Sequence, residues 1–264
     1  MDIVKYFYDS FWETEYDERT IDWWPVKHQW LVWTILASYL YFVKRCGPRF
    51  MEKRRPYSFK TFIKYYNIFQ IIYNAWIIYA CIKYGLFHEI SLGCEFVNKS
   101  PTGNPMELAK VIYWTFMLKV IDLIETVIFV LRKKNRQISF LHLYHHASTI
   151  AVTHISVKHY PGGMVTFPIV LNSTVHVIMY TYYLLSSQGP KVQKIINPIK
   201  PYITIIQMVQ FFILLAHTVQ GFFPYCHVPR WGVLVMFANL VINFTLFFNF
   251  YIQNYKKPVK PKKS

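Results

Sequence analysis

Seven long apolar stretches, each close to the length that a helix needs to cross a bilayer, divide this sequence. They cover residues 28–46, 62–84, 106–131, 138–157, 164–187, 201–222 and 231–252. Charged residues make up only 16% of the chain, whereas a soluble domain carries about a quarter, and 54% of the residues are hydrophobic. The sequence therefore predicts an all-α membrane protein in which residues 1–264 form a single domain of seven transmembrane helices.

Basic residues fall in alternate loops, and this pattern predicts the orientation of the chain. The loops after the first, third and fifth stretches and the tail 253–264 are rich in Lys and Arg. Because cytoplasmic loops carry the excess of positive charge, we expect these loops and the C-terminus in the cytosol and the N-terminus on the opposite side. The acidic and aromatic first residues do not resemble a cleavable signal peptide.

The net charge of +16 indicates anionic partners. A nucleic acid would need a continuous basic surface, but the basic residues lie in short loops between apolar stretches. Anionic lipid headgroups and a phosphate-bearing ligand fit this pattern better, and no nucleic-acid partner is expected.

Two of the four cysteines, Cys94 and Cys226, fall in loops that are predicted to face a lumen. A secretory lumen is oxidising and allows a disulfide between them. Their spacing does not decide between a disulfide and two free thiols. Cys46 and Cys81 lie at a cytosolic interface and inside a span, so neither is expected to pair.

Ionisable side chains interrupt the third and fourth stretches, where they are costly and usually mark a site. Lys119, Asp122 and Glu125 lie on the third stretch. The fourth carries a histidine box, His142, His145 and His146, whose spacing of i, i+3 and i+4 predicts one helical face and one shared cluster. Lys119 also suits a buried ion pair, and the two carboxylates suit a role in orienting an imidazole.

Polar side chains on four stretches are expected at a similar depth, near the cytosolic side. Glu125, Gln207 and His145 each lie about 10–13 Å from a basic loop, at 1.5 Å per residue, and His176 lies deeper. This predicts a chamber that opens to the cytosol and is closed by apolar luminal halves. An alternative is that Asn172, His176, Tyr180, Gln207 and Gln210 only form hydrogen bonds between helices.

A histidine box supports two chemistries. In membrane desaturases and hydroxylases, several such boxes bind two irons, but this chain has one HxxHH and few further candidate ligands. A neutral imidazole can instead attack an activated acyl group or transfer a proton. A third reading is a transporter or receptor without enzymatic activity, in which the box has no essential role.

Five segments together resemble the fatty acid elongase (very-long-chain 3-oxoacyl-CoA synthase) family, and the likeness runs over about residues 25–255. They are Lys119–Thr126, FVLRKK, HLYHH, LNSTVHVIMYTYY and TIIQMVQ. The sequence around Asn172 resembles that of the family branch that acts on long and very long acyl chains. This chain departs from the family pattern KxxExxDT, because Asp122 stands at the position of the Glu and Glu125 at the position of the Asp.

The resemblance implies an endoplasmic reticulum protein with a luminal N-terminus and a cytosolic C-terminus, in which six of seven helices enclose a closed acyl tunnel. It implies condensation of acyl-CoA with malonyl-CoA, with no bound cofactor or metal. His145 would be the acylated nucleophile and His176 would assist the condensation. His142, His146, Asp122 and Glu125 would orient or tune these two histidines.

The resemblance also suggests residues that contact the substrates, a retrieval signal and partners. Arg132, Lys133 and Lys134 are candidates for the CoA phosphates, although topology alone accounts for basic residues there. The other candidates for substrate binding are Lys119, Asn172, Tyr180, Gln207 and Gln210. Lys260 and Lys262 fit a dilysine-type retrieval signal. Since no dinucleotide-binding fingerprint is present, we expect partner 3-oxoacyl-CoA reductase, dehydratase and enoyl reductase enzymes, and a homodimer is an open option.

Overall fold

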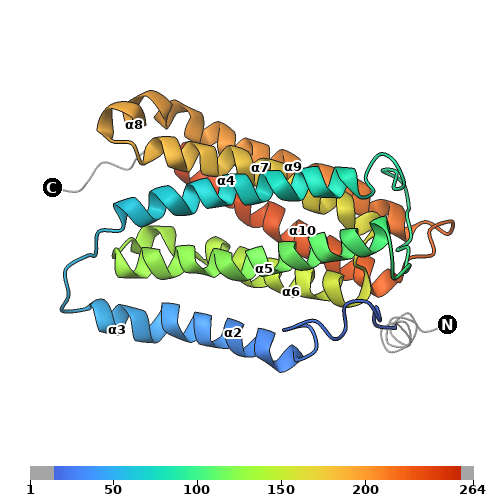
Figure 1. The fold of residues 1–264 in the computed structure, drawn as a ribbon. Coiled ribbons are helices and arrows are strands. Elements are labelled where there is room, and N and C mark those ends of the chain that lie inside the picture. Colours follow the sequence, from blue (N-terminus) through green and yellow to red (C-terminus); the bar gives the residue numbers. More distant parts are fainter. Residues whose placement is uncertain (1–14, 257–264) are drawn as a thin grey trace.

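A computed structural model describes residues 15–256, and within this range the chain folds into seven helical segments (Figure 1). The first segment runs through α2 (Gln29–Tyr41), a π-helical turn (Phe42–Cys46) and α3 (Gly47–Met51). The others are α4 (Lys60–Lys83), α5 (Asn104–Leu131), α6 (Phe140–His159), α7 (Thr166–Ser186), α8 with α9 (Pro190–Ile196 and Lys200–Val219) and α10 (Arg230–Tyr251). Each predicted stretch begins within two residues of a helix start, which confirms the prediction of an all-α chain.

Three of these segments are long and apolar enough to cross a membrane by length and composition: Gly163–Ser186, Pro190–Phe222 and Arg230–Lys256. Helix α5 contains Lys119, Asp122 and Glu125, and α4 contains several amide side chains, so both have a lower hydropathy. Hydropathy therefore identifies membrane spans most clearly in the C-terminal half, and the chain is a membrane protein in which the polar residues are concentrated on the earlier helices.

Six helices form a ring. Contacts between them run in a circuit from α4 to α5, α6, α10, α9 and α7, and from α7 back to α4. Helices α2 and α3 lie outside this ring and pack against α5 (Figure 1). A Cβ atom on Gly47 would lie 2.6 Å from Cγ1 of Val130, so the glycine allows α3 to approach α5 closely. Small residues often have this role where helices pack in a membrane.

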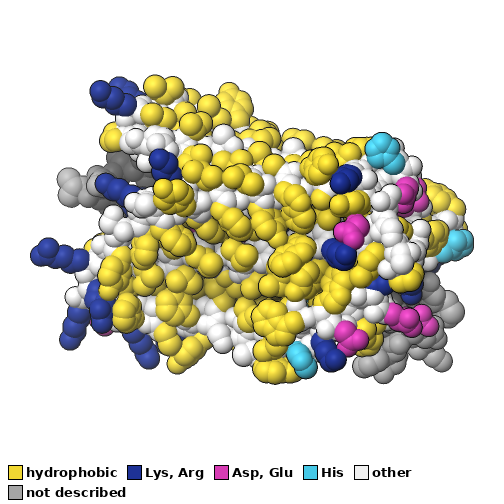
Figure 2. Space-filling model, viewed as in Figure 1, with side chains coloured by type: hydrophobic (Ala, Val, Ile, Leu, Met, Phe, Trp, Pro, Cys, Tyr) yellow, Lys and Arg dark blue, Asp and Glu magenta, His cyan; other side chains and the backbone are white. Residues whose placement is uncertain are grey.

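The two ends of the ring differ in charge. The loops 52–59 and 132–139 and the segment 187–199, which contains α8, lie at one end, which we call the basic end. Lys and Arg side chains gather there (Figure 2). The loops 84–103 and 223–229 lie at the other end, which we call the disulfide end. Acidic and histidine side chains gather at that end of the visible face (Figure 2).

A disulfide joins Cys94 to Cys226, and it links the two loops of the disulfide end across a sequence separation of 132 residues. Gly163 lies beside the first loop with a φ of +53°, and a Cβ atom there would lie 2.6 Å from the carbonyl oxygen of Glu95. Only glycine adopts this backbone conformation easily and leaves room for the loop.

The segment that precedes α2 is fixed against the disulfide end by buried polar contacts. Asp17 and Arg19 form a salt bridge of 2.7 Å with side chains that are 0% and 4% exposed. Arg19 Nη1 also donates to the carbonyl oxygen of Pro105 at 3.0 Å, and Thr20 Oγ1 donates to that of Val157 at 2.6 Å. These contacts connect the segment with the start of α5 and the end of α6.

Removal of the disulfide by the Cys94→Ser/Cys226→Ser double substitution is expected to destabilise the protein by about 2–5 kcal/mol, because the cross-link restricts the unfolded chain. Thermal unfolding of the detergent-purified protein measures this as a lower Tm, and a reductant should lower the Tm of the wild type in the same way. Cys46→Ser, at an exposed free cysteine, serves as the control and should keep the wild-type Tm. Equal Tm values for the double variant and the wild type would contradict the prediction.

Candidate functional site

The rings of the three histidines of the box lie in one cluster. His142 and His146 lie one helical turn apart on α6, and their ring centroids are 4.3 Å apart. The ring of His145 lies 5.8 Å from that of His146, and it also packs against Phe247 of α10 at 5.9 Å between centroids. The prediction of one shared cluster is therefore confirmed by the ring contacts, and within this cluster His145 is the member that meets α10.

His142 and His146 are held by side chains of α5. The Nε2 atom of His142 is hydrogen-bonded to Oγ1 of Thr126 at 2.8 Å, and Thr126 is hydrogen-bonded to the hydroxyl of Tyr39 at 2.9 Å. The Nε2 atom of His146 lies 3.9 Å from Oε2 of Glu125. Both contacts fit a role in fixing the imidazole rings.

A second polar network lies between α4 and α5. Nζ of Lys119 lies 3.6 Å from Oδ2 of Asp122, which forms the predicted ion pair, and both side chains are almost fully buried. Nε2 of Gln70 donates to Oδ1 of Asp122 at 2.6 Å and to the hydroxyl of Tyr66 at 2.9 Å. Tyr66 and Gln70 are not among the residues that the sequence predicted for the site. The signal was the row of amides at Asn67, Gln70 and Asn74, which recur at helical spacing inside an apolar stretch.

A cavity of about 1110 Å³ is lined by five helices of the ring, α5, α6, α7, α9 and α10, and by residues of the two loops at the disulfide end. This volume exceeds the roughly 300–1,000 Å³ of typical small-molecule pockets. Apolar side chains such as Val152, Ile169 and Leu214 form much of its wall. The cavity therefore suits a long, mostly apolar ligand.

Four of the predicted catalytic and substrate-binding residues line the cavity: Lys119, His145, Asn172 and Gln210. Among the described residues, its lining does not include His142, His146, Asp122, Glu125, His176, Tyr180 or Gln207. His176 packs instead on Tyr180, with ring centroids 5.8 Å apart, and Nε2 of Gln207 lies 3.5 Å from Sδ of Met179. The site thus has a part that faces the cavity and a part that supports it.

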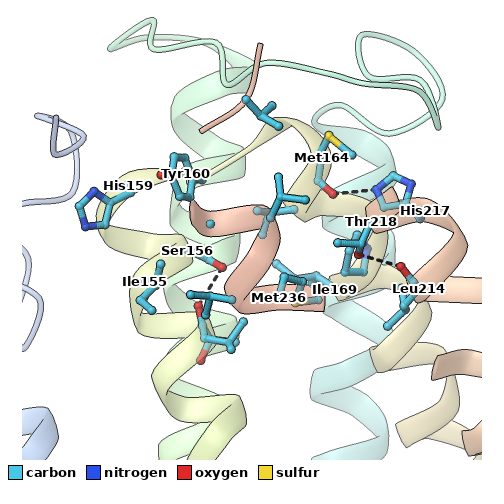
Figure 3. A pocket seen from close by; sticks show the side chains of 18 of the residues that line it. Ile155, Ser156, His159, Tyr160, Met164, Ile169, Leu214, His217, Thr218 and Met236 are labelled. Carbon is cyan, nitrogen blue, oxygen red and sulfur yellow. Dashed lines mark hydrogen bonds between the residues drawn. The ribbon is translucent and has the colours of Figure 1, made fainter. Parts of the chain in front are cut away.

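The cavity runs from His145 to the disulfide end, where polar side chains replace the apolar wall. Fourteen residues separate His145 from His159 on α6, which is about 21 Å at 1.5 Å per residue. His159, His227 and Glu95 line this end, and His217 is hydrogen-bonded to the carbonyl oxygen of Met164 (Figure 3). The expectation of apolar luminal halves is wrong here, because the connecting loops contribute polar groups that a view limited to the spans leaves out.

Other predicted residues lie away from the cavity. Arg132 and Lys134 are at the basic end, where Lys133 donates from Nζ to the carbonyl oxygen of Glu52 at 3.2 Å. The retrieval residues Lys260 and Lys262 lie outside the described residues.

Within residues 15–256, no group of three or more His, Cys, Asp or Glu side chains is arranged to hold a metal ion. In the histidine box, one imidazole is hydrogen-bonded to a threonine and another lies near a carboxylate. A hydroxyl and a carboxylate are partners that can hold an imidazole ring in one orientation.

Comparison with known proteins matches residues 24–263 to the GNS1/SUR4 family (ELO). The human very long chain fatty acid elongase 4 is 35% identical over 256 residues, which cover 97% of this chain and 81% of that protein. The very long chain fatty acid elongase 7 of Drosophila melanogaster is 35% identical over 261 residues, which cover 97% of this chain and 79% of that protein. Mouse very long chain fatty acid elongase 1 is 36% identical over 231 residues, or 86% of this chain and 82% of that protein.

Proposed function

This chain belongs to the GNS1/SUR4 (ELO) family of fatty acid elongases, and we propose that it catalyses the condensing step of fatty acid elongation. In this step, acyl-CoA and malonyl-CoA give 3-oxoacyl-CoA, carbon dioxide and free CoA. The observation that carries the proposal is the place of His145, an imidazole on the wall of a large cavity lined by five helices of the ring. A nucleophile in this position can meet the carboxyl end of an acyl chain while the tail fills the cavity.

In the first half-reaction, a nitrogen lone pair of His145 attacks the thioester carbonyl carbon of acyl-CoA. The C–N bond forms and the C–S bond breaks, so that CoA leaves as a thiolate and takes the proton released by the imidazole. The product is an acyl-imidazole. His142, His146, Asp122 and Glu125 support this step by holding the histidine box and the adjoining turn of α5.

In the second half-reaction, malonyl-CoA loses carbon dioxide, and the electron pair of the broken C–C bond gives an enolate. The enolate carbon attacks the acyl-imidazole carbonyl, and the C–N bond breaks to release 3-oxoacyl-CoA. The imidazolate that leaves takes up one proton from water, which regenerates neutral His145. His176 is proposed to assist this step. Its Nδ1 atom is buried and has no hydrogen-bond partner among the described residues, so it is available to a bound group.

The cavity is proposed to be the acyl tunnel, enclosed by the six-helix ring. An extended chain of single bonds advances about 1.2 Å per bond, as a polypeptide does with three bonds in roughly 3.6 Å. The distance of about 21 Å from His145 to His159 therefore accommodates about 17 bonds. Acyl chains longer than this would have to bend inside the cavity, and its volume of about 1110 Å³ leaves room for a bent chain.

CoA is proposed to enter at the basic end, where Arg132, Lys133 and Lys134 offer charges to its phosphates. All seven helical segments are proposed to span the membrane of the endoplasmic reticulum. The basic end and the C-terminus then face the cytosol, and the disulfide end faces the lumen. Substrates are acyl-CoA and malonyl-CoA, with no bound cofactor, and the reductases and dehydratase of the elongation cycle are the expected partners.

The test of this function is an elongation assay with detergent-purified protein, a long-chain acyl-CoA and radiolabelled malonyl-CoA. We expect labelled 3-oxoacyl-CoA that forms without added metal and persists with an iron chelator. Omission of malonyl-CoA is the control and should abolish the product. An oxidised or desaturated acyl product that depends on iron and oxygen would contradict the proposal and favour an oxygenase, which the relatives do not support.

A further inference from the structure

Lys119 has a buried ammonium group that its ion pair leaves unsatisfied. Its side chain is 5% exposed, and its Nζ atom has no hydrogen-bond partner among residues 15–256. The distance of 3.6 Å to Asp122 is close enough to balance charge but lies outside hydrogen-bond distance. An ammonium carries three N–H donors, and leaving them unpaired in a buried site is costly. A bound group that accepts hydrogen bonds would relieve this cost.

Asp122 is bound by a different donor. Nε2 of Gln70 donates to its Oδ1 atom at 2.6 Å, and the carboxylate is 3% exposed. The carboxylate is therefore held by Gln70 next to Lys119, while the N–H groups of Lys119 remain available to a ligand.

Lys119 and His145 line the same cavity at the same depth. Lys119 lies fifteen residues after the start of α5 and His145 fourteen before the end of α6, so both are about 21–23 Å from the disulfide end. Among the described residues, the other lysine and the arginine of the lining, Lys99 and Arg230, lie at the disulfide end.

We propose that Lys119 is a catalytic residue whose ammonium donates to the oxygen of the substrate's acyl carbonyl when His145 attacks it. The inference rests on the proposed function. As the C–N bond forms, the C=O π electrons move to the oxygen, and Lys119 stabilises this oxyanion. The oxyanion then re-forms the carbonyl, the C–S bond breaks and the CoA thiolate leaves. A donor fixed in advance where charge develops is the most effective form of such stabilisation.

The test is the Lys119→Met variant, which removes the ammonium and keeps an unbranched side chain. Rapid quenching and intact-mass analysis measure the single-turnover rate of acyl transfer from a long-chain acyl-CoA to the protein. We expect this rate to fall by about 10²–10³-fold, as for the loss of one oxyanion donor, while the half-saturating concentration of acyl-CoA stays unchanged. A wild-type rate in Lys119→Met overturns the inference.

A second pair of variants separates this role from a purely structural ion pair. If Lys119 only neutralises Asp122, the Lys119→Met/Asp122→Asn double variant contains no unpaired charge and should recover the acylation rate. If Lys119 stabilises the oxyanion, the double variant stays as slow as Lys119→Met, so recovery overturns the inference. The double variant also carries the test if Lys119→Met does not fold.

Failure of this inference can be distinguished from failure of the proposed function. A wild-type protein that makes no 3-oxoacyl-CoA contradicts the function itself. A wild-type protein that makes it, beside a Lys119→Met variant with an unimpaired rate of acylation, contradicts only the role of Lys119. Wild-type turnover without any acyl adduct also overturns the inference as stated, because His145 then does not attack the carbonyl.

Discussion

Replacement of His145 by alanine is expected to lower the rate of elongation at least about 10³-fold, because removal of a covalent nucleophile leaves only binding and positioning. The residue lines the cavity and contacts Phe247, so alanine leaves a small space and should not disturb the polar network of His142 and Thr126. The loss is therefore expected in the chemical step and not in folding.

Intact-mass analysis after incubation with a long-chain acyl-CoA alone measures this directly. The wild type should gain one acyl group that malonyl-CoA discharges as 3-oxoacyl-CoA, and His145→Ala should gain none. His88→Ala, at an exposed histidine outside the cavity, is the control and should be acylated like the wild type. Product formation by the wild type without an adduct would replace the covalent mechanism with direct condensation, and full activity of His145→Ala would contradict any catalytic role.

The Met236→Trp variant is expected to shorten the acyl chains that the protein accepts. Met236 lines the cavity (Figure 3). It lies eleven residues before Phe247 on α10, and Phe247 contacts His145, so Met236 is about 16 Å along the cavity from the level of His145. At about 1.2 Å per bond, this distance corresponds to about 14 bonds. The larger indole side chain of Trp at this point should exclude acyl chains that extend further, because the packed wall cannot move aside without strain.

Elongation rates for acyl-CoA substrates of graded length, each expressed relative to the wild type, measure this effect. We expect Met236→Trp to lower the relative rate about 100-fold for chains of 20 or more carbons and to leave that for a 12-carbon chain nearly unchanged. Leu234→Trp introduces the same ring on the exposed side of α10, outside the cavity lining, and is the matched control. An equal loss at every chain length would show that Met236 does not limit the reach of the tail.

The sequence was sufficient to predict the helices, because their apolar stretches are long and the loops between them are short and polar. Hydropathy could not predict which helices adjoin, since an apolar residue that faces lipid and one that faces a neighbouring helix look alike. The circuit in which α10 meets α6, far apart along the chain, appears only in three dimensions.

The candidate site was predicted in part. Ionisable residues in apolar stretches identified α5 and the histidine box, since their burial needs a reason. Helical periodicity did not show which histidine lines the cavity. That depends on how α10 packs against α6, where Phe247 contacts His145. Gln70 was not predicted, because an uncharged amide stands out less than a carboxylate in an apolar stretch. It nevertheless donates a hydrogen bond of 2.6 Å to Asp122.

The ring has an implication for how the protein is made. Since α10 meets both α9 and α6, it completes the circuit, and it is the last of the ring helices to leave the ribosome. Without α10, the helices α6 and α9 lack the neighbour that each of them contacts in the complete ring, so we expect the polar groups between them to be exposed to lipid. A nascent chain that has reached only Val219 therefore exposes His145 and Asn172, and it should be a target for membrane chaperones and quality control.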